Sequence, residues 1–230
     1  MQNIGTYFVV DFDRCIGNID ASFNLLNEVA HELMIVNKEL FISMRKQAES
    51  EGKPFSAIEQ LKKKYPSTNL DIIEKMYLKK ASVLSSELLE PGARDFLDYL
   101  HFNKINFCIM SFGDERWQKV KIKGAGITKT PVIIVKRIDK SSHIREWLNP
   151  KSGEFLIPKK YFLDNKSKVA SEIVLIDDKV KAFENLPLNI RGYIVLGSSS
   201  TQTKLQIDGL PPSIKKVDHI NEIIDQEFLY

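Results

Sequence analysis

Side chains that can carry out phosphoryl chemistry follow short apolar runs at three places in this chain. They are the carboxylates Asp11 and Asp13, the hydroxyl of Ser111, and the paired carboxylates Asp177 and Asp178. Carboxylates gathered at one place raise each other's pKa values unless a cation lies among them. A few hard oxygen ligands that share a site with a phosphate suit Mg²⁺. One aspartate can then attack phosphorus to give an aspartyl-phosphate. A second can protonate the leaving oxygen and later activate water.

Five apolar runs are expected to form the strands that position these side chains. They cover residues 7–10, 107–110, 132–135, 173–176 and 193–196. Short runs without alternation suit strands that are covered on both faces, as in a parallel sheet flanked by helices. Helical segments lie between the runs, so the predicted fold class is α/β, a doubly wound parallel sheet. Period-two spacing places Asp11 and Asp13 on one side at the carboxyl edge, where open α/β sheets bind ligands.

The interval between the first and second runs is far longer than one crossover helix requires. Its apolar residues recur at helical spacing from Phe23 to Leu33, and less regularly through Leu40, Ile42 and Met44. We therefore predict an inserted α-helical subdomain over residues 19–90, with turns at 52–54 and 65–67. The α/β core is then formed by residues 1–18 and 91–230. Further helices are expected over residues 93–100, 141–148, 179–186 and 219–228, and a short extra strand over 154–158.

Composition limits the classes of partner. The 230 residues include 33 basic and 30 acidic side chains, a net charge of +3. This balance predicts neither nucleic acid nor an anionic membrane as a partner. No signal-peptide pattern is apparent at the N-terminus, and no apolar run approaches the roughly 20 residues that cross a bilayer. Cys15 and Cys108 are expected to be buried thiols in a reducing compartment, so the predicted location is cytoplasmic. The oligomeric state is not predicted.

The three motifs resemble those of the haloacid dehalogenase-like (HAD) superfamily, and the match covers nearly the whole chain. The family's first motif, an apolar strand that ends in Asp-x-Asp, is similar to residues 9–15. The second motif, a strand that ends in Thr or Ser, resembles residues 108–111, and the fourth, which ends in paired acids, resembles residues 174–178. A helical insert between the first and second motifs is what the family calls a C1 cap.

The resemblance implies a Mg²⁺-dependent phosphatase that acts on a small phosphorylated substrate. In it Asp11 is the nucleophile and a metal ligand, and Asp13 is the general acid/base, whose main-chain carbonyl also binds the metal. Ser111 would hold the phosphate, and Asp177 with Asp178 would complete the metal site. The acid at position 13 favours phosphate chemistry, because the dehalogenase branch lacks it. The substrate itself is not indicated, since specificity in such proteins resides in the cap.

Two features depart from the family pattern. Cys15 stands where Thr or Val is more common, and it is small enough to fit. The third-motif lysine, which would hold phosphate, has two candidates. Lys140 is preferred because it follows the third strand and opens a predicted helix. Lys160 remains open, since its distance from Asp177 also occurs in the family. Weaker candidates are Lys136 and Lys159.

Three other functions compete with the phosphatase. A phosphomutase of the same family has the same nucleophile and returns the phosphoryl group to the substrate. A signalling receiver module also combines strand-end aspartates, a hydroxyl and a lysine, but it places its phosphorylated aspartate centrally and lacks a large helical insert. A non-catalytic scaffold with the HAD fold is the third alternative, and the intact pair Asp11 and Asp13 argues against it.

Overall fold

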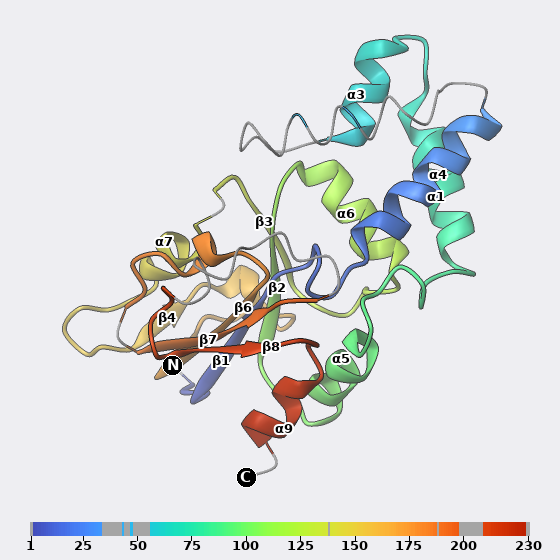
Figure 1. Ribbon diagram of the computed structural model, residues 1–230. Coiled ribbons are helices and arrows are strands. Elements are labelled where there is room, and N and C mark those ends of the chain that lie inside the picture. The colour runs from blue at the N-terminus through green and yellow to red at the C-terminus, as the bar shows by residue number, and fades with distance from the viewer. Residues whose placement is uncertain are drawn as a thin grey trace.

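The centre of the molecule is one parallel sheet. The computed structural model describes residues 2–33, 43, 47, 56–137, 139–187, 189–197 and 209–228. Within them, six strands lie in the order β3-β2-β1-β6-β7-β8 (Figure 1), and every neighbouring pair is parallel. The strands are β1 Thr6–Val10, β2 Phe107–Phe112, β3 Val132–Val135, β6 Glu172–Asp177, β7 Ile190–Val195 and β8 Ile214–Val217. The prediction of a doubly wound parallel sheet is confirmed.

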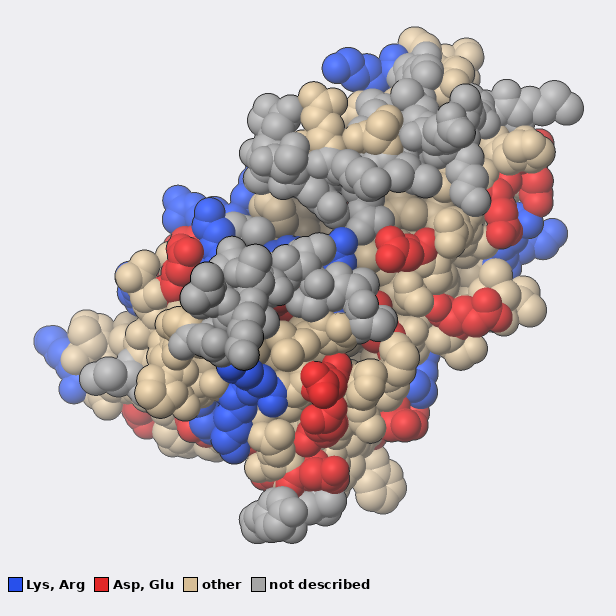
Figure 2. Space-filling view, in the orientation of Figure 1, with Lys and Arg blue, Asp and Glu red and all other residues tan. Residues whose placement is uncertain are grey.

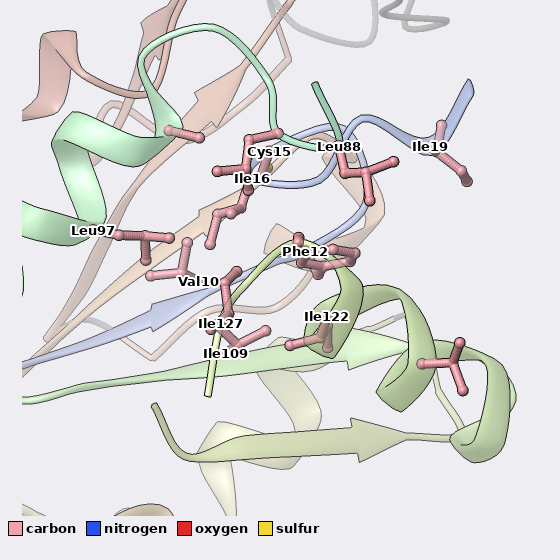
Figure 3. Packing of buried hydrophobic residues seen from close by; sticks show 14 of the residues in the cluster. Val10, Phe12, Cys15, Ile16, Ile19, Leu88, Leu97, Ile109, Ile122 and Ile127 are labelled. Carbon is pink, nitrogen blue, oxygen red and sulfur yellow. The ribbon is translucent and has the colours of Figure 1, made fainter. Parts of the chain in front are cut away.

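Successive residues of β1 point to opposite faces of this sheet, and each face has its own hydrophobic core. Phe8 and Val10 belong to the cluster that contains the helices α5 (Ala93–Phe102), α6 (Glu115–Gly124) and α9 (Glu222–Phe228). Figure 3 shows part of that cluster, where Phe12 and Ile122 lie close together. Tyr7 and Val9 belong to the second cluster, with α7 (Lys140–Arg145) and the 3₁₀ turns η1 (Lys159–Tyr161) and η2 (Val180–Phe183). The sheet is therefore covered on both sides.

Three further helices gather at the end of the molecule away from the N-terminus (Figure 1). They are α1 (Ile19–Glu32), α3 (Ala57–Lys64) and α4 (Leu70–Ala81), and α1 packs against α4. Each begins at a capping side chain, since Asn18, Ser56 and Asn69 accept hydrogen bonds from backbone amides two or three residues later. These helices lie within the predicted insert over residues 19–90, whose division from the core stays a prediction. The expected helical positions Leu40, Ile42 and Met44 and the turn at 52–54 lie outside the described residues.

Two of the predicted helices are wrong in extent. The helix expected over 179–186 is only the 3₁₀ turn η2, because Asn185 has a φ of 56° and Pro187 disfavours a helical residue before it. The helix expected over 141–148 ends at Arg145. Beyond it the carbonyl of Trp147 accepts a hydrogen bond of 2.7 Å from the amide of Leu156. That contact joins the segment after α7 to the predicted extra strand, β4 (Phe155–Ile157). β4 pairs antiparallel with β5 (Lys168–Ala170).

The visible surface carries charges of both signs. On the face drawn in Figure 2, lysine and arginine side chains lie interspersed with aspartate and glutamate. Within the described part of the chain, every helix is too short or too polar to span a membrane. The expected absence of nucleic-acid and membrane partners and the cytoplasmic location stay predictions.

Candidate active site

Three carboxylates meet at the carboxyl ends of the neighbouring strands β1 and β6. The parallel register pairs Val10 with Ile176, and the amide of Asp11 donates a hydrogen bond of 2.9 Å to the carbonyl of Ile176. Asp177 ends β6 and Asp178 follows it. The exposed fractions of Asp11, Asp177 and Asp178 are 3%, 2% and 4%. The structure thus brings these three predicted site residues together in a buried cluster.

Lys140 lies inside this cluster. It is the first residue of α7 and is only 2% exposed. Its Nζ donates to Oδ1 of Asp11 and, over 2.5 Å, to Oδ2 of Asp177. Lys160 belongs to η1 instead, and its Nζ lies 5.1 Å from the centroid of the Tyr161 ring. Of the two candidates for the third-motif lysine, the geometry therefore favours Lys140.

Burial has the largest influence on the pKa values of Asp11 and Asp178. It raises the pKa of Asp11 to about 6, although the charge of Lys140 acts in the opposite direction. Burial likewise raises the pKa of Asp178 to about 7, and Lys179, whose Nζ lies 3.7 Å from Oδ1 of Asp178, offsets only part of this. The charge of Asp177 adds to both shifts. A further cation in the cluster would favour the ionised carboxylates.

The donor atoms at this edge fit a divalent cation. Asp11, Cys15 and Asp178 each offer one ligand atom, and the three atoms lie within 4.8 Å of one another. Among the described residues, Oδ1 of Asp178 accepts no hydrogen bond although it is buried. The oxygens of Asp177 are engaged, Oδ2 by Lys140 and Oδ1 by the amide of Lys179 at 2.9 Å. Carboxylate oxygens suit Mg²⁺, so Asp11 and Asp178 are the side chains best placed to hold it.

Ser111 offers a buried hydroxyl beside the cluster. It lies in β2, which continues one residue beyond the predicted strand end, and its exposed fraction is 0%. Its Oγ has no hydrogen-bond partner among the described residues. A buried hydroxyl without a partner costs free energy, and a phosphate oxygen would supply the missing acceptor. The predicted role of Ser111 is compatible with this position.

Asp13 is held by two residues that lie outside the sequence motifs. Oδ1 of Asp13 forms an ion pair with Nζ of Lys121, and Oδ2 accepts a hydrogen bond of 2.9 Å from Nε2 of Gln118. Burial raises the pKa of Asp13, but the charge of Lys121 and the hydrogen bonds from Gln118 and Lys121 outweigh it. The pKa of Asp13 therefore lies below its ordinary value, whereas that of Asp11 lies above.

The helical periodicity of α6 indicates that Lys121 lies on the buried face of this helix. Lys121 stands four residues after Trp117 and four before Ala125, and both of these neighbours are buried. Residues at this spacing share one face of a helix, so a lysine there must lie on the buried side. A lysine on the buried face of a helix requires a partner of opposite charge. The sequence alone does not reveal that the partner is Asp13.

The fold is that of the HAD-like hydrolases, as the sequence motifs predict. A haloacid dehalogenase-like hydrolase from Burkholderia xenovorans superposes with a TM-score of 0.65 at 17% identity, over 97% of this chain and 96% of that one. The HAD-hydrolase YfnB from Bacillus subtilis, solved bound to magnesium, gives a TM-score of 0.51 at 16% identity over 98% and 99% of the two chains. A protein described as a beta-phosphoglucomutase from Thermotoga maritima gives 0.50 at 18% identity, covering 98% of each. No family model and no curated protein sequence matches the chain.

Mg²⁺ is expected to raise the melting temperature more near pH 8 than near pH 5. The folded pKa values of Asp11 and Asp178, about 6 and about 7, lie above those of an unfolded chain. Their contribution to stability is therefore present at low pH and is lost as the pH rises through these values. A bound cation removes that loss, whereas at low pH it must first displace protons. Thermal unfolding with Mg²⁺ and with EDTA at both pH values measures the difference.

Asp178→Asn provides the control for this experiment, because it removes the negative charge of the carboxyl group whose buried Oδ1 accepts no hydrogen bond among the described residues. The variant should lose most of the Mg²⁺-dependent shift at the higher pH. An equal shift at both pH values, or an unchanged shift in the variant, would show that Mg²⁺ binds elsewhere.

Proposed function

We propose that this protein is a Mg²⁺-dependent phosphomonoester phosphatase that forms an aspartyl-phosphate on Asp11. The observation that carries the proposal is the buried cluster in which Lys140 bridges Asp11 and Asp177 at the carboxyl edge of the sheet. Beside it, Asp178 and Ser111 hold buried oxygens without hydrogen bonds from the described residues. When bound, Mg²⁺ would offset the negative charge of the phosphoryl group beside an anionic nucleophile.

In the first step a carboxylate oxygen of Asp11 attacks phosphorus, and the bond between phosphorus and the leaving oxygen breaks. The leaving oxygen takes a proton from the carboxyl group of Asp13, so the alcohol departs neutral and Asp13 becomes a carboxylate. Lys140 has its charge beside Asp11 and can contact the phosphoryl oxygens as well. The hydroxyl of Ser111 can donate to another of them.

In the second step a water oxygen attacks the phosphorus of the aspartyl-phosphate. The carboxylate of Asp13 accepts the proton that the water loses, and the bond between phosphorus and the oxygen of Asp11 breaks. Inorganic phosphate leaves, and Asp11 returns to its carboxylate form while Asp13 is protonated for the next cycle. The low pKa of Asp13 suits this second step, because it favours the carboxylate that accepts the proton from water.

A phosphomutase is the second candidate, and the fold likeness to the protein described as a beta-phosphoglucomutase favours it. Such an enzyme uses the same first step and then returns the phosphoryl group to a substrate oxygen. Assays that measure both inorganic phosphate and isomerised phosphate ester separate the two functions. Phosphate release without isomer supports the phosphatase, and isomer without phosphate release supports the mutase.

The test of the proposed function is a hydrolysis screen with the purified protein. Para-nitrophenyl phosphate and a panel of small phosphorylated metabolites should be hydrolysed with Mg²⁺ and not with EDTA. The substrate that gives the highest kcat/KM identifies the natural class. A wild-type protein that hydrolyses nothing across such a panel with Mg²⁺ present would leave the scaffold alternative in place.

A further inference from the structure

Both carboxylate oxygens of Asp13 are held by α6. Nζ of Lys121 pairs with Oδ1, and Nε2 of Gln118 donates to Oδ2 over 2.9 Å. The two donors stand three residues apart on one helix, so they approach the carboxyl group from the same side. Each carboxylate oxygen has two lone-pair positions, so these two contacts leave one on each oxygen for proton transfer. The contacts therefore fix the plane of the carboxyl group without blocking it.

Lys121 is an unusually buried lysine. Its side chain is 1% exposed, and its Nζ lies 5.8 Å from the ring centroid of Phe12 and 5.7 Å from that of Trp117. Taking an ammonium group out of water is energetically costly. An ion pair with a carboxylate and contact with aromatic faces offset part of that cost. A protein that needed only to fill this space would be served by an apolar side chain, so the charge points to a role at Asp13.

The chain also leaves space for the amide of Gln118. Gly113 has a φ of 148°, and a Cβ atom built there would lie 2.6 Å from Nε2 of Gln118. The same Nε2 donates a second hydrogen bond, 2.9 Å long, to the carbonyl of Phe112. The amide is thereby oriented with its nitrogen toward Asp13, while its Oε1 has no hydrogen-bond partner among the described residues. Both hydrogen bonds that this amide donates hold its nitrogen toward Asp13.

The helix that carries both donors is firmly anchored. Asp114 caps α6 by accepting a hydrogen bond of 2.8 Å from the amide of Trp117. The indole of Trp117 packs against the Tyr77 ring of α4, with centroids 5.4 Å apart. Arg116 of α6 forms ion pairs with two acidic residues of α4, including Asp71 at 2.7 Å. The positions of Gln118 and Lys121 are thus determined by rigid packing.

We propose that Gln118 and Lys121 are positioning residues that orient Asp13 for proton transfer. The inference rests on the proposed function, since it assigns these two residues to the group that transfers the proton. A carboxyl group free to rotate would spend only part of its time aligned with the leaving oxygen or the attacking water. Removing either donor should slow turnover and leave substrate affinity nearly unchanged, because neither residue needs to touch the substrate.

A double-mutant cycle tests this assignment. Lys121→Met keeps the aliphatic stem against Phe12 and Trp117 and removes the ammonium. General acid–base catalysis contributes about 10²- to 10⁴-fold, so losing the orientation should lower kcat on the order of 10-fold or more, with KM within about twofold. In an Asp13→Asn background, the same Lys121→Met change should alter kcat by less than about twofold. Effects of residues that act as a unit are non-additive in this way.

Two further variants keep the result interpretable. Lys119→Met removes an exposed lysine of the same helix that pairs with Glu115, and it should leave kcat unchanged. Gln118→Leu removes the second donor without unpairing a charge, so it tests the assignment even where Lys121→Met fails to fold. Circular dichroism and thermal unfolding establish that each variant is folded.

The outcomes distinguish a failure of the proposed function from a failure of the positioning role. A wild type without phosphatase activity contradicts the proposed function. An active wild type in which folded Lys121→Met and Gln118→Leu behave like Lys119→Met contradicts the positioning role alone. The positioning role is also contradicted if the fold-losses in kcat from Lys121→Met and Asp13→Asn multiply in the double variant, because the lysine would then act independently of Asp13.

Discussion

Asp11→Asn is expected to lower kcat for phosphate ester hydrolysis by a factor on the order of 10⁴ or more, as loss of a nucleophile does in other covalent mechanisms. The amide that replaces the carboxylate carries no charge and is a poor nucleophile. Folding should survive, because Lys140 keeps its contact with Asp177. Burial already raises the pKa of Asp11 to about 6, so the ionised form at neutral pH is not a source of stability. Initial rates of phosphate release and thermal unfolding measure the two effects separately.

Asp95→Asn is the matched control, since Asp95 is an exposed carboxylate on α5 far along the chain from the cluster. It should retain wild-type turnover. Hydrolysis that persists at a comparable rate in a purified Asp11→Asn protein would mean that another group attacks phosphorus, and the assignment of Asp11 would be wrong.

Lys140→Met is expected to destabilise the metal-free protein by about 3–5 kcal/mol near pH 8, the usual cost of removing one partner from a buried ion pair. Asp11 and Asp177 would be left buried without the cation that both contact. The folded pKa of Asp11, already raised to about 6, would rise further without the lysine charge, so the deficit is smaller near pH 5, where Asp11 is protonated, and grows as the pH rises. Urea unfolding in EDTA at both pH values measures this dependence, and phosphatase activity should be lost as well.

Lys160→Met is the control for this prediction, because it removes the other candidate for the third-motif lysine. Lys160 lies on the surface over the Tyr161 ring, an exposed contact worth about 0.5–1 kcal/mol. Its loss should leave activity intact. The reverse pattern, with Lys160→Met inactive and Lys140→Met active, would overturn the choice between the two lysines.

The sequence predicts the centre of the sheet well, because the central strands are continuous apolar runs. β1, β2 and β6 are buried on both faces, and this burial is what such runs indicate. The edge strand β8 carries a weaker signal. In it Ile214 and Val217 are buried while the two lysines between them are exposed. Charged residues are common on edge strands because they discourage pairing with other chains. Because the two lysines interrupt the apolar run, β8 is not predicted from the sequence.

In the candidate site, too, residues marked by their local sequence could be predicted, whereas contacts between distant parts of the chain could not. Asp11 and Asp177 could be located because each follows an apolar run directly, and Asp178 because it follows Asp177. The choice between Lys140 and Lys160 depends on which loop returns to the sheet edge, and sequence distance alone does not determine that. The contact of Lys121 with Asp13 joins residues 108 positions apart. Helical periodicity can place Lys121 on a buried face, but only the folded chain identifies its partner.

The most direct test of the account is to find the covalent intermediate. Wild type and Asp13→Asn are mixed with substrate and Mg²⁺, quenched in acid, digested and analysed by mass spectrometry. We expect one phosphoryl group on the peptide that contains Asp11, more of it in Asp13→Asn because hydrolysis of the intermediate is slowed, and none in Asp11→Asn. A phosphoryl group on another residue, or rapid hydrolysis with no trapped intermediate in either protein, would contradict the nucleophilic role of Asp11.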